Sequence, residues 1–181
     1  MRLFLLILLC SMTCAQASVN LSNLDRDQKE KLFKGETVML EEKVKDAPWP
    51  RLKIYRVIDA DTESFAAFFA DFERQKDYIP NLIKSKITNG DGSNNIDVSY
   101  EMNLPWPIPN AVYLHGHTIK KLGQDHFQIS WYVVESSVAQ KVIGQSDFVK
   151  FKDKTLWYYE NFTLPKSSLA GLFEGSMKVD T

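Results

Sequence analysis

The chain of 181 residues carries 22 Lys and Arg side chains against 23 Asp and Glu, which gives a formal net charge of −1 at pH 7. Without a long basic run, this balance argues against nucleic-acid binding, which depends on basic groups that neutralise phosphates. The two cysteines, Cys10 and Cys14, both fall within residues 1–17. If that segment is removed, the remaining chain has neither disulfides nor cysteine metal ligands, and a hydrophobic core must stabilise it.

The first 17 residues have the layout of a secretory signal peptide. Arg2 supplies a positive charge, and residues 3–10 are apolar but too few to span a bilayer. Ala15-Gln16-Ala17 has the small-x-small pattern of a cleavage site. We therefore predict that residues 1–17 are removed, that the protein is exported to the periplasm or the extracellular space, and that residues 18–181 form a single domain.

A short helix and two strands are expected next. Asn23 is the candidate N-cap of a helix over residues 24–34, which Gly35 would end. Residues 36–44 and 52–58 alternate like strands. The intervening "DAPWP" separates them, because its prolines lack backbone donors and favour extended or turn geometry.

A second helix, capped by Asp61 or Thr62, has an aromatic face. Its phenylalanines stand at positions i, i+3, i+4 and i+7, which lie on one side of a helix: Phe65, Phe68, Phe69 and Phe72. A further short helix over residues 74–78 would stop at Pro80. The aromatic face predicts a helix that packs on a sheet.

Six strands in close succession make up the second half of the chain. They are predicted over residues 82–88, 96–104, 111–121, 126–135, 143–152 and 155–164, with turn residues such as "NGDGSNN" and "LGQD" between them. Consecutive strands joined by short turns favour an antiparallel meander. The expected fold class is therefore α+β, with an antiparallel sheet holding an amphipathic helix.

Alternation along these strands suggests which residues line the space between helix and sheet. Aromatic residues in phase with the apolar face include Tyr100, Trp131 and Tyr158, and we expect them to face Phe65, Phe69 and Phe72. Glu160 is in phase with Tyr158, and Arg56 is in phase with Ile54. The two charged residues are candidates for a polar anchor inside an apolar pocket, since a buried carboxylate needs a partner. The alternative is that one of them points outward at an edge or bulge.

The histidines allow two interpretations. His115 and His117 share a face of one strand, and His126 begins the next strand and could approach across the hairpin. A metal site would need all three histidines, or a further ligand beside His115 and His117. The favoured alternative places these histidines at the surface or at a sheet edge, so no metal site is predicted.

No catalytic motif is present. The sequence lacks a serine nucleophile in a His-Asp context, a glycine-rich phosphate loop and paired catalytic carboxylates. We predict no catalytic residue and no cofactor, which favours a binding protein over an enzyme.

The turn at residues 105–109 holds three prolines around Trp106. These prolines exclude a regular strand, and we predict a partly exposed lip at the mouth of the pocket. Trp106 would then contact an incoming lipid or, transiently, a membrane surface. The alternative is that Trp106 folds back onto the core as a plug.

The order of elements and two passages resemble the START-like superfamily (SRPBCC, helix-grip or Bet v 1-like). "DFERQKDYIPNLIKSKI" is similar to the passage before the first long meander strand, and "YEMNLPWPIPNAVY" to the proline-rich turn with an aromatic hairpin partner. The resemblance covers nearly all of residues 18–181, and START lipid-binding domains are the nearest in layout. It implies a curved sheet that grips a helix around a hydrophobic ligand. Family members end in a long helix, whereas the helix expected from residue 168 stops at Thr181, so we expect either a half-open cavity or, preferably, a truncated sequence.

Three functions remain open. The preferred one is an exported binding protein for a lipid or another hydrophobic small molecule, held in a cavity between the sheet and the helices. The second is an enzyme on the same scaffold, such as a cyclase, dehydratase or hydrolase acting on an apolar substrate. The third is a protein-interaction module with a filled core. Fold alone does not decide among them, because function depends on the site.

Overall fold

The computed structural model describes residues 19–90, 94–106 and 109–166. The predicted signal peptide and the helix predicted from residue 168 lie outside these ranges. One helix precedes the first two strands and a second helix follows them. A 3-10 helix then leads into six further strands. The elements are α1 (Arg26–Phe33), β1 (Val38–Glu42), β2 (Arg51–Ile58), α2 (Thr62–Ala70), the 3-10 helix η1 (Phe72–Asp77), β3 (Leu82–Gly90), β4 (Asn95–Met102), β5 (Ala111–Gly123), β6 (His126–Ser136), β7 (Ala139–Phe151) and β8 (Lys154–Pro165).

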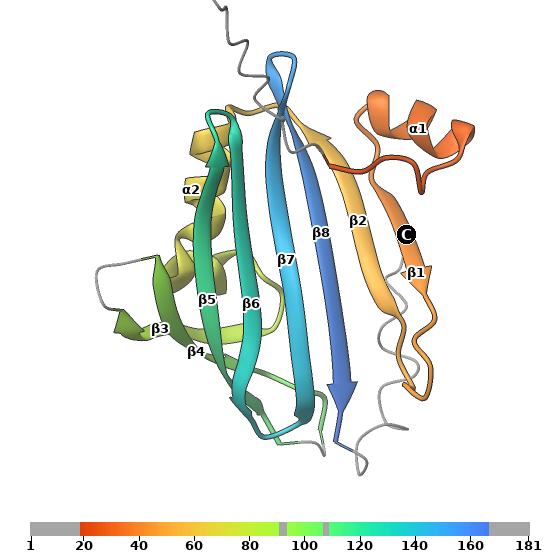
Figure 1. Cartoon of the computed structure of the whole chain (residues 1–181). Helices are drawn as coiled ribbons and strands as arrows, with labels where there is room; N and C mark the ends of the chain where they lie inside the picture. Colours follow the sequence, from red (N-terminus) through yellow and green to blue (C-terminus); the bar gives the residue numbers. More distant parts are fainter. Residues whose placement is uncertain (1–18, 91–93, 107–108, 167–181) are drawn as a thin grey trace, which may run out of the picture.

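All eight strands form one antiparallel sheet in the order β1-β2-β8-β7-β6-β5-β4-β3. Strands β3 to β8 follow the chain from neighbour to neighbour, so the predicted antiparallel meander is confirmed. The sheet continues beyond β8, because β2 pairs with the free edge of that strand. The sheet is curved and open, and α2 lies behind β5 and β6 in the view of Figure 1. This α+β arrangement is the predicted helix-grip fold. No helix in the described part of the chain is long and apolar enough to cross a membrane.

The first helix begins two residues later than Asn23 predicted. Asp25 is its N-cap, and the Asp25 carboxylate accepts a hydrogen bond from the Gln28 backbone N–H at 2.8 Å. The Gln28 side chain accepts the Asp25 backbone N–H in return at 3.0 Å, which completes a capping box. The helix is followed by Gly35 at φ +86°, a conformation that glycine adopts without strain. Leu32 is fully buried against β1 and β2.

The second helix is shorter than the four-phenylalanine pattern predicted. Asp61 caps it as expected, accepting from the Ser64 N–H at 2.8 Å. The helix ends at Ala70, because Asp71 adopts ψ 69° and redirects the chain into η1. Phe72 therefore enters the core from η1, with 1% of its surface exposed, whereas Phe68 stays 48% exposed.

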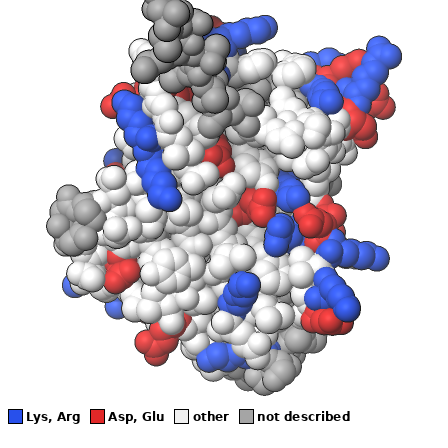
Figure 2. All heavy atoms as spheres, in the orientation of Figure 1, with Lys and Arg blue, Asp and Glu red and all other residues white. Residues whose placement is uncertain are grey.

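The two faces of the sheet are both covered in part. On one face, Phe65 and Phe69 of α2 pack against a cluster that includes Phe148 and Trp157. On the opposite face, α1 covers Tyr55 and Leu156. That opposite face looks toward the viewer in Figure 2, where charged side chains stand among uncharged ones. Neighbouring residues of β8 thus serve different hydrophobic clusters.

Candidate functional site

A cavity of about 520 Å³ lies between the sheet, α2 and η1. Half of its described lining residues are Phe, Tyr or Trp, and none of that lining is Lys, Arg, Asp or Glu. The lining residues come from α2, η1 and its flank, and the strands β3 to β8. They are Phe65, Phe68, Phe69, Gln75, Tyr78, Ile79, Leu82, Tyr100, Met102, Tyr113, His115, His117, Trp131, Val142, Trp157, Tyr159, Asn161 and Thr163.

The α2 side of the cavity is fixed by ring packing. The Phe69 ring lies 5.4 Å from the Phe148 ring centre and 6.4 Å from those of Trp131 and Trp157. Phe65 meets Phe148 and Trp157 edge to face. Such tilted and edge-to-face pairs favour fixed ring positions, so α2 presents a defined aromatic surface to the cavity.

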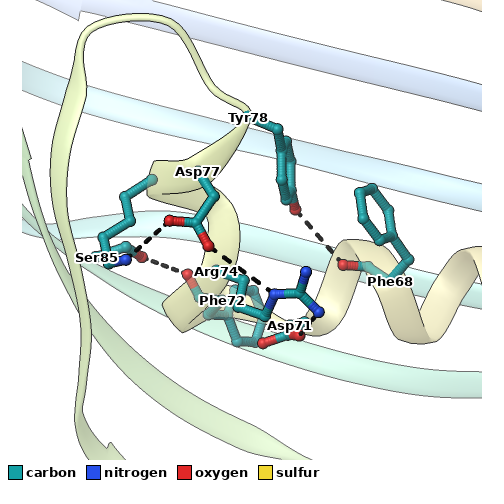
Figure 3. Close-up of polar contacts among 8 residues, drawn as sticks. Phe68, Asp71, Phe72, Arg74, Asp77, Tyr78 and Ser85 are labelled. Atoms are coloured by element: carbon teal, nitrogen blue, oxygen red, sulfur yellow. Dashed lines mark hydrogen bonds and ion pairs between the residues drawn. The ribbon is translucent and has the colours of Figure 1, made fainter.

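Polar contacts hold η1 against α2 and β3. The Ser85 hydroxyl donates to the Phe72 carbonyl at 2.5 Å, and the Gln75 side chain donates to the Phe69 carbonyl at 3.0 Å. The Tyr78 hydroxyl reaches the Phe68 carbonyl at 3.5 Å, and the rings of these two residues stack 4.8 Å apart. Figure 3 shows the Tyr78 hydroxyl at the Phe68 carbonyl of α2 and the Ser85 hydroxyl at the Phe72 carbonyl of η1. Phe68 and Tyr78 are both exposed, so they form an apolar rim of the cavity.

Trp131 forms the floor of the cavity over β7. Gly144 pairs with Trp131 on one side and with Asn161 on the other. The Trp131 indole N–H donates to the Asn161 side-chain oxygen at 3.1 Å. A Cβ atom at Gly144 would lie 2.4 Å from the indole, so the absence of a side chain there lets the ring lie across β7.

The polar side of the cavity is formed by four residues of β4 and β5, here called the histidine wall: Tyr100, Tyr113, His115 and His117. The Tyr100 hydroxyl and His117 Nε2 are hydrogen-bonded at 3.1 Å. The His117 ring lies 4.4 Å from the ring of Phe72, which supports it from behind. His117 is buried and His115 lines the cavity, so the interpretation of these two as surface or edge histidines is wrong.

His126 lies elsewhere. It is buried on the face opposite the cavity, where its Nε2 contacts Asp147 Oδ1 at 2.8 Å. Asp147 also accepts hydrogen bonds from Gln128 and Gln145. Within the described residues, no group of three His, Cys, Asp or Glu side chains could hold a metal ion.

Burial keeps the histidine wall uncharged near neutral pH. It lowers the pKa of His115 to about 4. The pKa of His117 falls to about 3, through burial first and through the neighbouring His115 second. Burial also raises the pKa of Tyr100 and Tyr113 above the ordinary tyrosine value. The charged forms are disfavoured because they lose their hydration.

Four of the residues predicted to bind a ligand line the cavity: Phe65, Phe69, Tyr100 and Trp131. Their contact with a ligand stays a prediction. Phe72 lies outside the lining, buried beneath His117. Trp106 is 93% exposed and also lies outside the lining, so the alternative in which it plugs the core is wrong.

The predicted anchor between Arg56 and Glu160 does not form. Glu160 lies 3.2 Å from Arg51 Nη1 and accepts a hydrogen bond from the Tyr158 hydroxyl. The Tyr158 ring packs on Tyr55, on the α1 side of the sheet. Arg56 is exposed and belongs to a separate hollow near the β7–β8 turn. The phase expected for β8 was therefore reversed: Trp157, Tyr159 and Asn161 face the cavity, and Tyr158 and Glu160 face away from it.

Sequence reasoning could not choose between these faces because β8 carries aromatic residues in both phases. One signal was available in the neighbouring strand. A glycine inside a strand, such as Gly144, often marks the close approach of a ring or ligand. It could have pointed to the floor of the cavity.

A curved antiparallel sheet that holds a helix over an apolar cavity places the chain in the START-like, helix-grip fold. Neither a protein-family model nor a curated protein matched the sequence.

Solved structures share the fold at low sequence identity. A STAR-related lipid transfer protein from Xanthomonas axonopodis superposes with a TM-score of 0.68 and 15% identity, over 77% of this chain and 84% of that one. Human STARD10 gives 0.58 and 16%, over 89% of this chain and 76% of that one. The Zhui aromatase/cyclase from a Streptomyces species gives 0.55 and 11%, over 65% and 68%. At such identities the similarity shows the fold alone, and function must be argued from the site.

Proposed function

We propose that this protein binds a lipid or another hydrophobic small molecule in the cavity between α2 and the sheet. The observation that carries the proposal is the cavity itself, about 520 Å³ in volume with a mainly apolar and uncharged described lining. Small-molecule sites are commonly apolar cavities of roughly 300–1,000 Å³ with a few placed polar groups. The histidine wall and Asn161 supply such groups here.

Transfer of apolar surface from water is the expected driving force. A ligand that buries about 200 Å² of apolar surface gains roughly 5 kcal/mol before the costs of association. The aromatic side chains around Phe69 and Trp131 are held in place by their neighbours, so little side-chain ordering is required on binding.

Native mass spectrometry of the purified protein tests the proposal. We expect a second mass peak that exceeds the polypeptide mass by that of a small apolar molecule, or the appearance of such a peak after incubation with a lipid extract. A peak at the polypeptide mass alone after both treatments would argue against the proposal.

An enzymatic function on the same scaffold is the second candidate, and the histidine wall favours it. A neutral imidazole beside a tyrosine hydroxyl can accept and return a proton, and the Tyr100–His117 hydrogen bond lies within the cavity lining. An aromatase/cyclase is among the structures that share the fold. Ligand recovered after incubation separates the two candidates, because a binding protein returns it chemically unchanged and an enzyme does not.

Export is a separate proposal that the pattern of residues 1–17 supports. We expect the mature chain to begin at Ser18 outside the cytoplasm. Intact-mass measurement of the protein recovered from the exported fraction tests this expectation, and an N-terminus at Met1 would refute it.

Transient membrane contact completes the proposed function. The exposed Trp106 beside three prolines offers an apolar body and one N–H group that can stay hydrated. Ligand entry from a membrane would place this side chain at the lipid surface.

A further inference from the structure

The polar groups of the cavity are not spread evenly. Tyr100, Tyr113, His115 and His117 stand together on β4 and β5, with the His115 ring centre 5.4 Å from Tyr100, 5.5 Å from Tyr113 and 6.1 Å from His117. Asn161 lies three strands away on β8, and at about 4.8 Å per strand that is roughly 14 Å along the sheet. Asn161 and the histidine wall are therefore separate polar regions of the lining.

The polar groups of these two regions are paired to different extents. The Asn161 oxygen accepts from Trp131, and its amide nitrogen donates to Thr163 at 3.2 Å. In the histidine wall, by contrast, His115 Nε2 and His117 Nδ1 are buried and have no hydrogen-bond partner within the described part of the chain. Buried polar atoms are nearly always paired, so two unpaired ring nitrogens in one wall call for an explanation.

We infer that the cavity selects an uncharged ligand whose polar end is a hydroxyl or a carbonyl group, and that this end hydrogen-bonds to the histidine wall. This inference rests on the proposed function and names the chemical class of its ligand. The apolar body then extends toward Phe69 and Trp157, whose ring centres lie 6.4 Å apart in the lining.

The hydrogen-bonding inventory supports a neutral polar end. A neutral imidazole has one donor and one acceptor nitrogen, and its tautomer follows its partners. If the Tyr100 hydroxyl donates to His117 Nε2, then His117 Nδ1 carries a hydrogen that suits a carbonyl or hydroxyl oxygen. If Nε2 donates instead, the Tyr100 hydroxyl is free to donate. In both arrangements, a ligand hydroxyl or carbonyl finds a complementary group once the rings turn to expose the buried nitrogens.

A charged end would lack compensation at the same place. The described lining contains no Lys or Arg to pair with a carboxylate or phosphate, and no Asp or Glu to pair with an ammonium group. An ion taken from water into such a site loses its hydration and gains only neutral dipoles in return. The histidines resist becoming cationic partners, since burial keeps them neutral.

Calorimetric titration with four compounds of similar apolar body tests the inference: naphthalene, 2-naphthol, 2-acetylnaphthalene and 2-naphthoate. At about pH 7.5, the alcohol and the ketone are neutral and the acid is ionised. We expect both neutral polar compounds to bind about tenfold or more tightly than 2-naphthoate, and several-fold more tightly than naphthalene. Comparison of 2-naphthol with 2-acetylnaphthalene shows whether the histidine wall prefers a hydroxyl or a carbonyl group.

Two variants locate the effect. His115→Phe should bring the affinities of 2-naphthol and naphthalene to within about threefold of each other. His126→Gln is the matched control, because His126 lies on the opposite face and should leave the preference unchanged. If His115→Phe does not fold, nitrogen-15 NMR of the parent protein gives a second readout. In that experiment 2-naphthol should shift the ring nitrogens of His115 or His117, and naphthalene should not.

The possible results separate the inference from the proposed function. Binding of naphthalene together with equal or tighter binding of 2-naphthoate would overturn the neutral-ligand inference and leave the apolar cavity in place. Unshifted histidine nitrogens with bound 2-naphthol would overturn it as well. Failure of all four compounds to bind would instead count against the proposed function itself.

Discussion

The indole N–H of Trp131 on β6 donates to the Asn161 side chain on β8 at 3.1 Å, and the intervening residue on β7 is Gly144. The bond crosses a whole strand, because a glycine leaves room for the ring to lie over the backbone. It fixes the floor of the cavity and engages the side-chain oxygen of Asn161. The buried ring nitrogens of the lining that have no hydrogen-bond partner in the described part of the chain belong to the histidine wall.

Gly144→Ala should displace Trp131 into the cavity. The new Cβ would stand 2.4 Å from two indole carbons and 2.6 Å from the Glu160 carbonyl oxygen, so the ring or the backbone must shift. We expect a loss of about 1–3 kcal/mol in the free energy of unfolding, a changed tryptophan emission spectrum and weaker ligand capture. Urea denaturation and fluorescence measure these effects.

Gly90→Ala is the control for that substitution. Its Cβ would meet no atom of the described residues within 4 Å, and Gly90 has no positive φ. Its unfolding free energy should stay within about 0.5 kcal/mol of the parent. Equal losses for the two alanine variants would contradict the role assigned to Gly144.

Phe69 and Phe72 should respond differently to truncation. Phe72 is 1% exposed and belongs to the core, so Phe72→Ala should cost about 3–5 kcal/mol of unfolding free energy. Phe69 is only partly buried and lines the cavity, so Phe69→Ala should cost less than that and should weaken ligand capture more. Thermal unfolding and ligand titration of both variants check this contrast. An unchanged melting temperature with unchanged ligand capture in Phe69→Ala would refute its assignment to the cavity.

Acid should destabilise the protein through the histidine wall. In the folded state, His115 and His117 bind protons only near their lowered pKa values of about 4 and about 3, whereas unfolded histidine has a pKa near 6.5. Between these values the unfolded state binds more protons, so stability falls as the pH decreases from 6.5 toward 4.

Replacement of one histidine should reduce that dependence. His115→Phe should lower the slope of unfolding free energy against pH by up to about 1.4 kcal/mol per pH unit within this window. Tyr113→Phe is the control, because burial raises the pKa of Tyr113 and keeps its titration far from acid pH. Chemical denaturation at several pH values measures the slopes, and parallel curves for His115→Phe and the parent would contradict the burial of a neutral His115.

Trp106 provides the test of membrane contact. Because it is 93% exposed, its fluorescence should shift to shorter wavelength if it enters a lipid surface. The parent protein should show such a shift with lipid vesicles, and Trp106→Phe should show a markedly smaller one. An identical vesicle-induced shift in the variant would remove Trp106 from the contact.

The antiparallel meander and the helix α2 could be predicted because local patterns determine them. Asp61 caps α2 as predicted, and turn residues separate the meander strands where the structure turns. Alternation alone could not assign the faces of β8, since α1 buries Leu156 on one side and the cavity takes Tyr159 on the other. A strand covered on both faces carries apolar residues in both phases. Alternation then does not show which residues face the cavity.

The histidines were misplaced for a related reason. His115 and His117 alternate with Gly116 and Thr118, a pattern equally compatible with an exposed strand. Their burial depends on Phe72, which comes from η1, and on Trp131 of the next strand. Such long-range packing of a neutral polar residue leaves no local signal in the sequence.

The central claim is that the cavity binds an uncharged apolar molecule. Fluorescence titration with prodan, a neutral naphthyl ketone whose emission depends on its surroundings, tests this claim most directly. We predict saturable binding of one prodan per chain with emission typical of an apolar site. We also predict its loss in Thr163→Trp, which adds bulk to the lining, provided that variant unfolds with parental cooperativity. Absence of saturable prodan binding, or equal binding by a folded Thr163→Trp protein, would contradict the account.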